Sequence, residues 1–220
     1  MGSRRIVTGA VLLMCTAQYF VAELIAASAW TDPSYSWTRD YISELGAVQC
    51  DPDTCSPYHL VVQFSLVLHG FLVVAAAALL LSWFPSRIVR LALGLLAAVH
   101  VAGNLVVASA PLSPTSGANT VHYLGSAVGI CSGIALVGLV GLLDLAAAHQ
   151  SRVHGIFSLT CSAVSLVGLV LVRWNATHDG GLPAGVLERM AVDPIVVWYV
   201  VSGLALMLST ARRAHRPVSA

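Results

Sequence analysis

Long apolar runs alternate with short polar connections along most of the chain. The apolar runs cover about residues 6–30, 58–83, 88–110, 119–148, 153–173 and 194–210. A helix that crosses the hydrocarbon core of a bilayer needs about 17 to 25 residues, and each run reaches this length. We therefore predict an all-α polytopic membrane protein, in which residues 1–220 form a single bundle of six transmembrane helices.

The first run has a second interpretation. A basic pair, Arg4 and Arg5, precedes it, and residues 27–29 (Ala-Ser-Ala) resemble the cleavage site of a secretory signal peptide. The run is too long for the apolar core of a signal peptide, and the polar residues Gln18 and Glu23 interrupt it. We therefore expect an uncleaved first helix.

The last run carries a signal for the start of a helix. Asp193 is a favourable N-cap, and Pro194 then stands at the first helical position, where a missing N–H costs nothing. The sequence predicts that the sixth helix starts at this pair.

The arginines predict how the bundle is oriented. The chain has 11 Lys and Arg side chains, and all of them are arginines. With the N-terminus inside, the inner set is Arg4, Arg5, Arg87, Arg90, Arg152, Arg212, Arg213 and Arg216, and the outer set is Arg39, Arg173 and Arg189. Positive charge gathers on the cytoplasmic side of membrane proteins, so we predict a cell-membrane protein with both termini in the cytoplasm.

Composition supports the membrane assignment. Hydrophobic residues make up 57% of the chain and charged residues only 10%, which is too few charges to cover the surface of a water-soluble domain. The net charge of +1 provides no basic surface for nucleic acid. The partner that composition predicts is therefore the lipid bilayer, and no nucleic acid is expected.

The longest polar passage before residue 110 lies in the first outer loop. Residues 37–46 read WTRDYISELG and place Arg39, Asp40, Ser43 and Glu44 beside aromatic side chains. The predicted outer loops are longer than the inner ones, and long loops commonly carry function. We expect residues 37–46 to cap a polar cavity in the outer half of the bundle.

Polar side chains interrupt the predicted helices at similar depths. They are Glu23, Gln63, His69, His100, Asn104 and His122. At about 1.5 Å per residue, three of them lie roughly 8 to 10 Å below the outer ends of their helices, and His69 and His100 lie near the middle. Polar groups are costly in hydrocarbon and indicate a functional site. Either they line one wet cavity, or they form interhelical hydrogen bonds that contribute about 0.6 kcal/mol each.

Three residues near this cavity are candidates for acid–base chemistry. Glu44, Glu188 and His122 supply the carboxylates and imidazole that transfer protons in many enzymes. The candidate ligand-binding residues are Arg39, Asp40, Arg189, Asn104, His100, Glu23, Gln63 and His69. The alternative is that the charged residues at the mouth form structural ion pairs, which hold two loops together.

The histidines do not follow a metal-binding spacing. The motifs HxxxH and HExxH are absent, so the sequence predicts no metal site. Haem bound between His69 and His100 is an alternative, although the second histidine pair of a two-haem protein is missing. The sequence identifies no cofactor.

Two of the five cysteines lie close together in the first outer loop. Cys50 and Cys55 bracket four residues, and outside the cytoplasm this favours a disulfide. A metal site formed with His59 is the alternative. The remaining cysteines, Cys15, Cys131 and Cys161, lie in predicted helices and are interpreted as small apolar side chains.

The fourth run contains small residues and one acid. Gly125, Gly129 and Gly133 repeat every four residues, which allows two helix backbones to approach closely. This stripe either packs within the chain or forms an oligomer interface. Asp144, near the inner end of the same run, is expected to reach the interface or to pair with Arg152.

Four short motifs follow one another along the chain: YISELGA at 41–47, HG at 69–70, VHYLGS at 121–126 and GVLERM at 185–190. In this order they resemble the bacterial and archaeal membrane family catalogued as domain of unknown function 998. The resemblance covers about Ile6 to Thr210 and implies six transmembrane helices without an established activity.

The positions that match the family pattern are Ser43, Glu44, Leu45, Gly46, His122, Gly125, Leu187, Glu188 and Arg189. Family members often carry aspartate where this chain has Glu44, and both side chains are carboxylates. The insert between Cys50 and Cys55 and the residue Val186 depart from the pattern. The resemblance therefore supports the topology and leaves the function open.

Two functions remain open. The first is an enzyme or binding protein that handles a lipid or small molecule in the outer cavity. The second is a non-enzymatic accessory, sensor or assembly protein, in which the polar residues only join helices and loops. Transport has less support because the sequence shows neither an inverted repeat nor a pair of broken helices.

Overall fold

A computed structural model of the protein describes residues 3–31, 34–49, 54–84, 86–113, 116–147, 151–178 and 180–214. The α-helices in these ranges are α1 (Ser3–Cys15), α2 (Gln18–Ser28), α3 (His59–Leu80), α4 (Arg87–Ser109), α5 (Ser116–Ala147), α6 (Arg152–His178) and α7 (Ala184–Ala214). The 3-10 helices are η1 (Ser43–Gly46) and η2 (Leu81–Trp83). The predictions made for Cys50, Ala148 and Arg216 fall outside the described residues.

The described chain has six helical stretches that are long and apolar enough to cross a membrane. They are Arg4–Ser28, His59–Trp83, Arg87–Ser109, Asn119–Ala146, Arg152–His178 and Ala184–Arg212. This finding confirms the predicted all-α fold with six membrane-spanning helices. The orientation of the bundle in the membrane stays a prediction.

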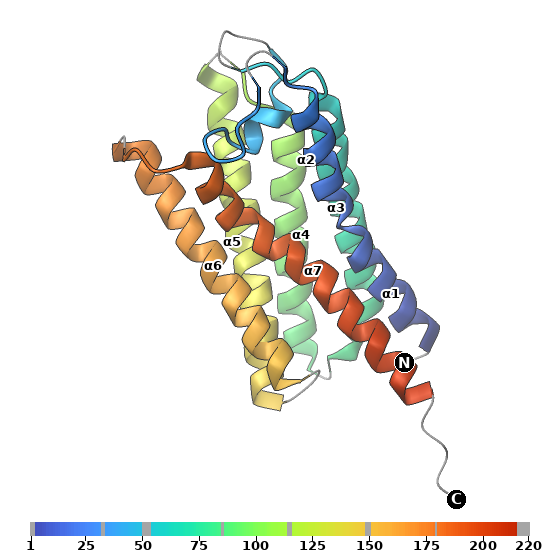
Figure 1. The fold of residues 1–220 in the computed structure, drawn as a ribbon. Coiled ribbons are helices and arrows are strands. Elements are labelled where there is room, and N and C mark those ends of the chain that lie inside the picture. Colours follow the sequence, from blue (N-terminus) through green and yellow to red (C-terminus); the bar gives the residue numbers. More distant parts are fainter. Residues whose placement is uncertain are drawn as a thin grey trace, which may run out of the picture.

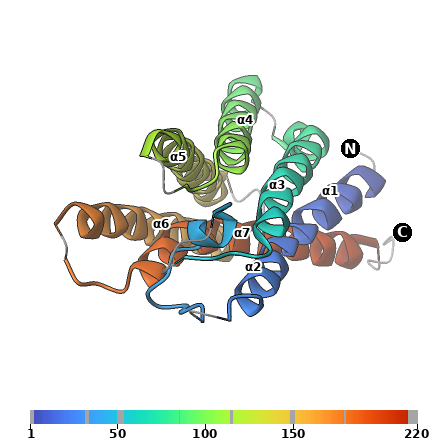
Figure 2. The same ribbon diagram turned by 90° about the horizontal axis from the view of Figure 1, so that it is seen from above.

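The six spans form a closed ring in chain order. Each span packs against the next one, and α7 returns to pack along α1. Helix α7 crosses the bundle at a steep tilt (Figure 1). The start of α1 and the end of α7 lie at one end of the bundle, which we call the termini end. The loop between α2 and α3, with η1, covers the opposite end, which we call the loop end, and η1 lies over the middle of the bundle (Figure 2).

Large apolar side chains cover much of the outside of the ring. Phe64, Phe71, Ile88 and Val153 are each at least 60% exposed. Such a surface is unstable in water but matches the hydrocarbon of a bilayer, where no hydrophobic penalty applies. The exposed apolar faces therefore support membrane insertion of the whole ring.

The sequence predicted one continuous helix over residues 6–30, but the first span consists of two helices. Helix α1 ends at Cys15 and α2 begins at Gln18. At the break, Thr16 N donates to Leu13 O at 3.1 Å, and Thr16 Oγ1 donates to the same carbonyl at 2.6 Å. The hydroxyl and the tighter i to i−3 bonds replace the regular helical pattern here.

The predicted start of the last helix is also wrong. Helix α7 begins at Ala184, and Pro194 lies in its interior. The start follows a different proline: Pro183 O accepts hydrogen bonds from Val186 N and Leu187 N, which forms the first turn. Pro194 removes one donor inside the helix, a loss that membrane helices tolerate where the backbone is packed against protein.

The glycine stripe of α5 packs against α4 within the chain. A Cβ atom added at Gly103 of α4 would lie 2.4 Å from Gly129 N and 2.8 Å from Gly125 O. Only glycine at position 103 allows this approach of the two backbones. The structure thus shows the first of the two roles considered for the stripe, and an oligomer stays a prediction.

Candidate functional site

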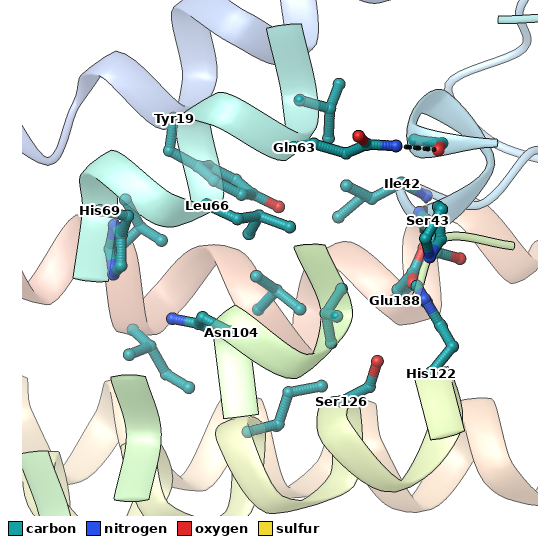
Figure 3. A pocket seen from close by; sticks show the side chains of 18 of the residues that line it. Tyr19, Ile42, Ser43, Gln63, Leu66, His69, Asn104, His122, Ser126 and Glu188 are labelled. Carbon is teal, nitrogen blue, oxygen red and sulfur yellow. Dashed lines mark hydrogen bonds between the residues drawn. The ribbon is translucent and has the colours of Figure 1, made fainter. Parts of the chain in front are cut away.

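A cavity of about 100 Å³ lies beneath η1 at the loop end. Figure 3 shows Ser43, Glu188 and His122 at one end of the cavity, and His69 and Asn104 towards the other. The predicted site residues that line it are Gln63, His69, His100, Asn104, His122 and Glu188. They come from α3, α4, α5 and α7, so polar side chains of four spans converge on one cavity, and most of the remaining lining is apolar, including Leu66, Ile130 and Val196. Ser43 from η1 and Tyr19 from α2 complete the polar part of the lining, together with Ser126 of α5.

Polar side chains hold η1 over this cavity at both of its ends. Near its start, Ile42 N donates to Glu188 Oε2, and Ser43 N donates to the same oxygen at 3.3 Å. At its end, Gln63 Nε2 donates to Gly46 O at 3.2 Å. The two side chains belong to α7 and α3, the two spans that flank the first span, so η1 is fixed to two different helices. This explains why a four-residue helix keeps a defined position.

The deep end of the cavity contains a pair of histidines. His100 Nδ1 donates to Gly129 O at 2.8 Å, so its Nε2 is the nitrogen that accepts from Asn104 Nδ2 at 3.3 Å. The ring of His69 lies edge-on to that of His100, with 5.8 Å between the ring centroids. His69 Nδ1 is buried and has no hydrogen-bond partner among the described residues. A buried unpaired nitrogen is costly, and it marks the point where a ligand would gain most.

His122 is buried and lines the cavity near η1, which forms the roof of the cavity. Its Nδ1 donates to Ala110 O at 2.9 Å, which fixes the ring and makes Nε2 the basic nitrogen of the neutral form. Helix α5 thus presents an oriented imidazole to the cavity, as proton transfer or ligand binding would require.

Glu23 does not line the cavity, although the sequence placed it with the other polar residues. Its carboxylate accepts from Arg189 Nη2 at 3.2 Å. The same guanidinium donates to the Tyr35 hydroxyl at 2.7 Å and to Trp37 O at 3.0 Å, and it lies 4.7 Å from the centroid of the Trp37 ring. The physical reason is that Arg189, from another helix, reaches the acid and neutralises it. These contacts join the loop to α2 and α7, whereas the ion-pair alternative expected Arg189 to pair with an acid at the mouth and to hold two loops together.

The phenol of Tyr35 is part of this network. Burial raises its pKa well above the ordinary value. The hydroxyl therefore keeps its proton, and it donates to Tyr41 O at 3.0 Å while it accepts from Arg189.

Arg39, Asp40 and Glu44, the charged candidates within residues 37–46, do not line the cavity. Glu44 Oε2 accepts from Tyr41 N at 2.7 Å, and Asp40 Oδ2 accepts from Ser36 N at 2.6 Å. Both carboxylates thus stabilise local turns of the loop. Arg39 is exposed. Sequence proximity to the roof did not reveal that the side chains at 39, 40 and 44 lie away from the cavity.

The haem and metal alternatives fit the structure poorly. His69 and His100 are in ring contact, which leaves no space for a macrocycle between them. In the part of the chain that the structure describes, no group of three or more His, Cys, Asp or Glu side chains is arranged to hold a metal ion. Cys55 is disulfide-bonded, so its thiolate is not available to a metal. Its predicted partner Cys50 lies outside the described residues, so the pairing stays a prediction.

A second polar cluster was missed by the sequence interpretation. Asp144 does not reach the interface as predicted: it is 1% exposed, and its Oδ2 lies 2.5 Å from His154 Nδ1. His154 Nε2 lies 2.9 Å from Ser202 Oγ. The three residues come from α5, α6 and α7, and no spacing in the sequence links them.

Comparisons with known proteins support the topology and name a family. The curated proteins contain no match to this chain, and neither do the solved structures. Residues 13–205 match the family described as "Protein of unknown function (DUF998)". The match includes all four of the motifs that resemble this family. The chain therefore belongs to the DUF998 family of proteins of unknown function.

Proposed function

We propose that this membrane protein binds a small molecule or a lipid head group in the cavity beneath η1. The observation that carries the proposal is the convergence of six polar side chains from four spans on one cavity. Paired side chains alone would satisfy one another without leaving a space between them. A largely apolar cavity with a few convergent polar groups is instead a typical ligand site.

The charge of the lining narrows the class of ligand. Among the described residues that line the cavity, Glu188 is the one acid, and no Arg or Lys side chain lines it. Arg189 is engaged by Glu23 and Tyr35 instead. An anionic head group would therefore lack a cation, so the lining favours a neutral or cationic ligand with hydrogen-bond donors and acceptors.

The location of the cavity suggests the side from which a ligand arrives. The structure describes the side chains of six of the eight arginines in the predicted inner set. All six lie near helix ends in the termini half: Arg4, Arg5, Arg87, Arg90, Arg152 and Arg212. This bias favours a cytoplasmic termini end and a loop end outside the cell membrane. The ligand then enters from outside, past η1 or between spans.

A role in catalysis would use the two acid–base groups of the lining. His122 offers a basic nitrogen, and Glu188 lies on the same cavity. Glu188 already accepts two backbone hydrogen bonds from the start of η1, so a ligand that competes for this carboxylate would also loosen the roof. Glu44 is not part of this proposal, because its carboxylate stabilises the loop outside the cavity.

Native mass spectrometry of the purified protein tests the binding proposal. We expect a bound molecule in the wild type and its loss in Asn104→Leu, which removes a polar group of the lining. Gln18→Leu is the matched control, because Gln18 donates to Ser65 O at 3.0 Å away from the cavity. A wild type without a bound molecule from its native membranes, or equal loss in both variants, contradicts the proposal.

A non-enzymatic accessory role is the second candidate. It is favoured by the contacts of Arg189, which use a charged side chain entirely to join the loop, α2 and α7. This role predicts a protein partner that cross-links to residues 34–49 in native membranes. It also predicts that Asn104→Leu leaves the function intact, which distinguishes it from ligand binding.

A further inference from the structure

The cluster of Asp144, His154 and Ser202 has a defined chemical order. The Asp144 carboxylate lies 2.5 Å from His154 Nδ1, and His154 Nε2 lies 2.9 Å from Ser202 Oγ. All three side chains are buried, with exposures of 1%, 6% and 3%. A carboxylate that orients an imidazole, which in turn contacts a hydroxyl, is the arrangement that activates serine as a nucleophile on unrelated folds.

Close packing of α5 and α6 brings Asp144 and His154 into contact. A Cβ atom added at Gly141 would lie 3.0 Å from Ser158 Cβ and 3.1 Å from Gly155 O. Gly141 lies three residues before Asp144, and Gly155 directly follows His154, so the close approach of the helices lets these two side chains meet. Ser158 Oγ also donates to His154 O at 2.8 Å, and it accepts from Trp198 Nε1 at 2.7 Å, which joins α7 to the same level.

The cluster faces a second cavity, of about 110 Å³, towards the termini end. Asp144, His154 and Ser202 all line it, and most of the remaining lining is apolar, including Leu13, Val73 and Trp83. His154 is two residues from the start of α6, so this level lies near one membrane surface. An apolar cavity with one reactive polar wall suits a ligand with a hydrocarbon chain and a single ester group.

We propose that Ser202 and His154 are catalytic residues for the cleavage of a lipid-like acyl ester, with Asp144 as the positioning residue. The acyl chain lies in the apolar cavity, and the ester carbonyl lies beside Ser202. The proposal does not rest on ligand binding beneath η1, although the ring of Tyr199 also packs against those of His69 and His100, which line that cavity.

The reaction balances with water as the second substrate. Ser202 Oγ attacks the ester carbonyl carbon and transfers its proton to His154 Nε2. The bond to the leaving alcohol then breaks, and His154 returns the proton to that alcohol, which leaves an acyl group on Ser202. Water attacks the acyl-serine with His154 as the base, the bond to Oγ breaks, and the acid departs as Ser202 regains its proton.

Tyr199 is placed to stabilise the negative charge of the tetrahedral intermediate by a hydrogen bond. It lies three residues before Ser202 on α7, on the same face of the helix, and it lines the same cavity. Its buried hydroxyl has no hydrogen-bond partner among the described residues. A donor without a partner can serve the developing oxyanion, a role that backbone N–H groups inside a helix cannot fill.

Labelling with an alkyl fluorophosphonate tests the nucleophile. The wild-type protein in detergent should form a covalent phosphonyl adduct on Ser202, with loss of fluoride, and it should release nitrophenolate from 4-nitrophenyl butyrate. Ser202→Ala and His154→Gln should lose both signals. Ser165→Ala is the matched control, because Ser165 is a fully buried serine of α6 that lines neither cavity.

The role of Asp144 has its own readout. Asp144→Asn should lower the rate of labelling by roughly 10⁴-fold and change its pH profile, as loss of the orienting carboxylate does in serine hydrolases. A purely structural role would change the unfolding temperature without changing the pH profile. Folded wild-type protein that reacts with neither probe between pH 6 and 10, or that carries the adduct on another residue, overturns the proposal. Retention of the ligand beneath η1 in Ser202→Ala separates this result from the first site.

Discussion

Arg189 on α7 lies 3.2 Å from Glu23 on α2, and this pair joins the first and last spans at the loop end. The side chain of Glu23 is 5% exposed and that of Arg189 is 15% exposed, so water screens the pair only weakly. Removing one partner of a buried ion pair leaves a charge without compensation, which costs more than the pair contributes.

Glu23→Ala should therefore lower the free energy of unfolding by about 3 to 5 kcal/mol. Replacing both residues, as Glu23→Leu with Arg189→Met, should recover part of this loss because no charge stays buried. Chemical unfolding in detergent measures both variants. Arg39→Ala serves as the control at an exposed arginine and should change stability by no more than about 0.5 kcal/mol. An equally large effect of the control would refute the ion-pair explanation.

The buried phenol of Tyr35 predicts a loss of stability in alkaline solution. Its pKa is raised in the folded protein, so the folded state favours the neutral form more strongly than the unfolded state does. This contribution is complete below the ordinary tyrosine pKa of about 10 and is lost as the pH rises above that value. Thermal unfolding between pH 8 and 11.5 should show a steeper decline in the wild type than in Tyr35→Phe. Parallel curves for the two proteins would contradict the prediction, and Tyr58→Phe, at an exposed tyrosine, is the control.

The crossing of α4 and α5 predicts a strong sensitivity to one methyl group. In Gly103→Ala the new Cβ would meet the backbone of Gly129 at 2.4 to 2.5 Å, so the two helices must separate. We expect the free energy of unfolding to fall by about 1 to 3 kcal/mol, the usual cost of overpacking. Gly94→Ala, on the same helix, meets only the flexible end of Leu81 at 3.3 Å and should be nearly neutral. Unfolding temperatures in detergent compare the two, and similar values for both would disprove the close approach.

The hold of Glu188 on η1 predicts a change in hydrogen exchange. In Glu188→Ala the amides of Ile42 and Ser43 lose their acceptor, so they should exchange about 10- to 100-fold faster, as expected for hydrogen bonds to a charged group. Glu44→Ala should instead affect the amide of Tyr41, since that is the group its carboxylate accepts from. Hydrogen exchange followed by mass spectrometry distinguishes these patterns. Unchanged exchange at positions 42 and 43 would show that Glu188 does not hold the roof.

The sequence predicted the spans and most of the polar side chains that line the cavity, because both follow from position along the chain. Apolar length determines which segments cross a bilayer, and distance from a helix end determines depth. Gln63, Asn104 and His122 have similar depths, so a ring of six spans brings them to one level. Depth alone does not give direction, however. Glu23 has the same depth as these residues but points to Arg189, and no pattern on α2 reveals this.

The cluster that the sequence did not predict depends on how helices cross. Asp144 meets His154 because Gly141 and Gly155 bring α5 and α6 together, and this pair of small residues was the available signal. The start of α7 depends on Pro183, whereas Pro194 has the stronger local signature for a helix start. In the first case packing between helices brings the side chains together, and in the second a turn at Pro183 starts the helix before the stronger signal is reached.

The interruption at Thr16 divides the first span into two rods with a joint between them. The rod on the loop side, α2, carries Glu23 and contacts η1, while the rod on the other side, α1, packs along α7. A helix with a break transmits less bending than a continuous one. Displacement of η1 by a ligand should therefore tilt α2 without moving α1 away from α7. Helix α7 lines both cavities, so any coupling between them should pass along α7 and not through the first span.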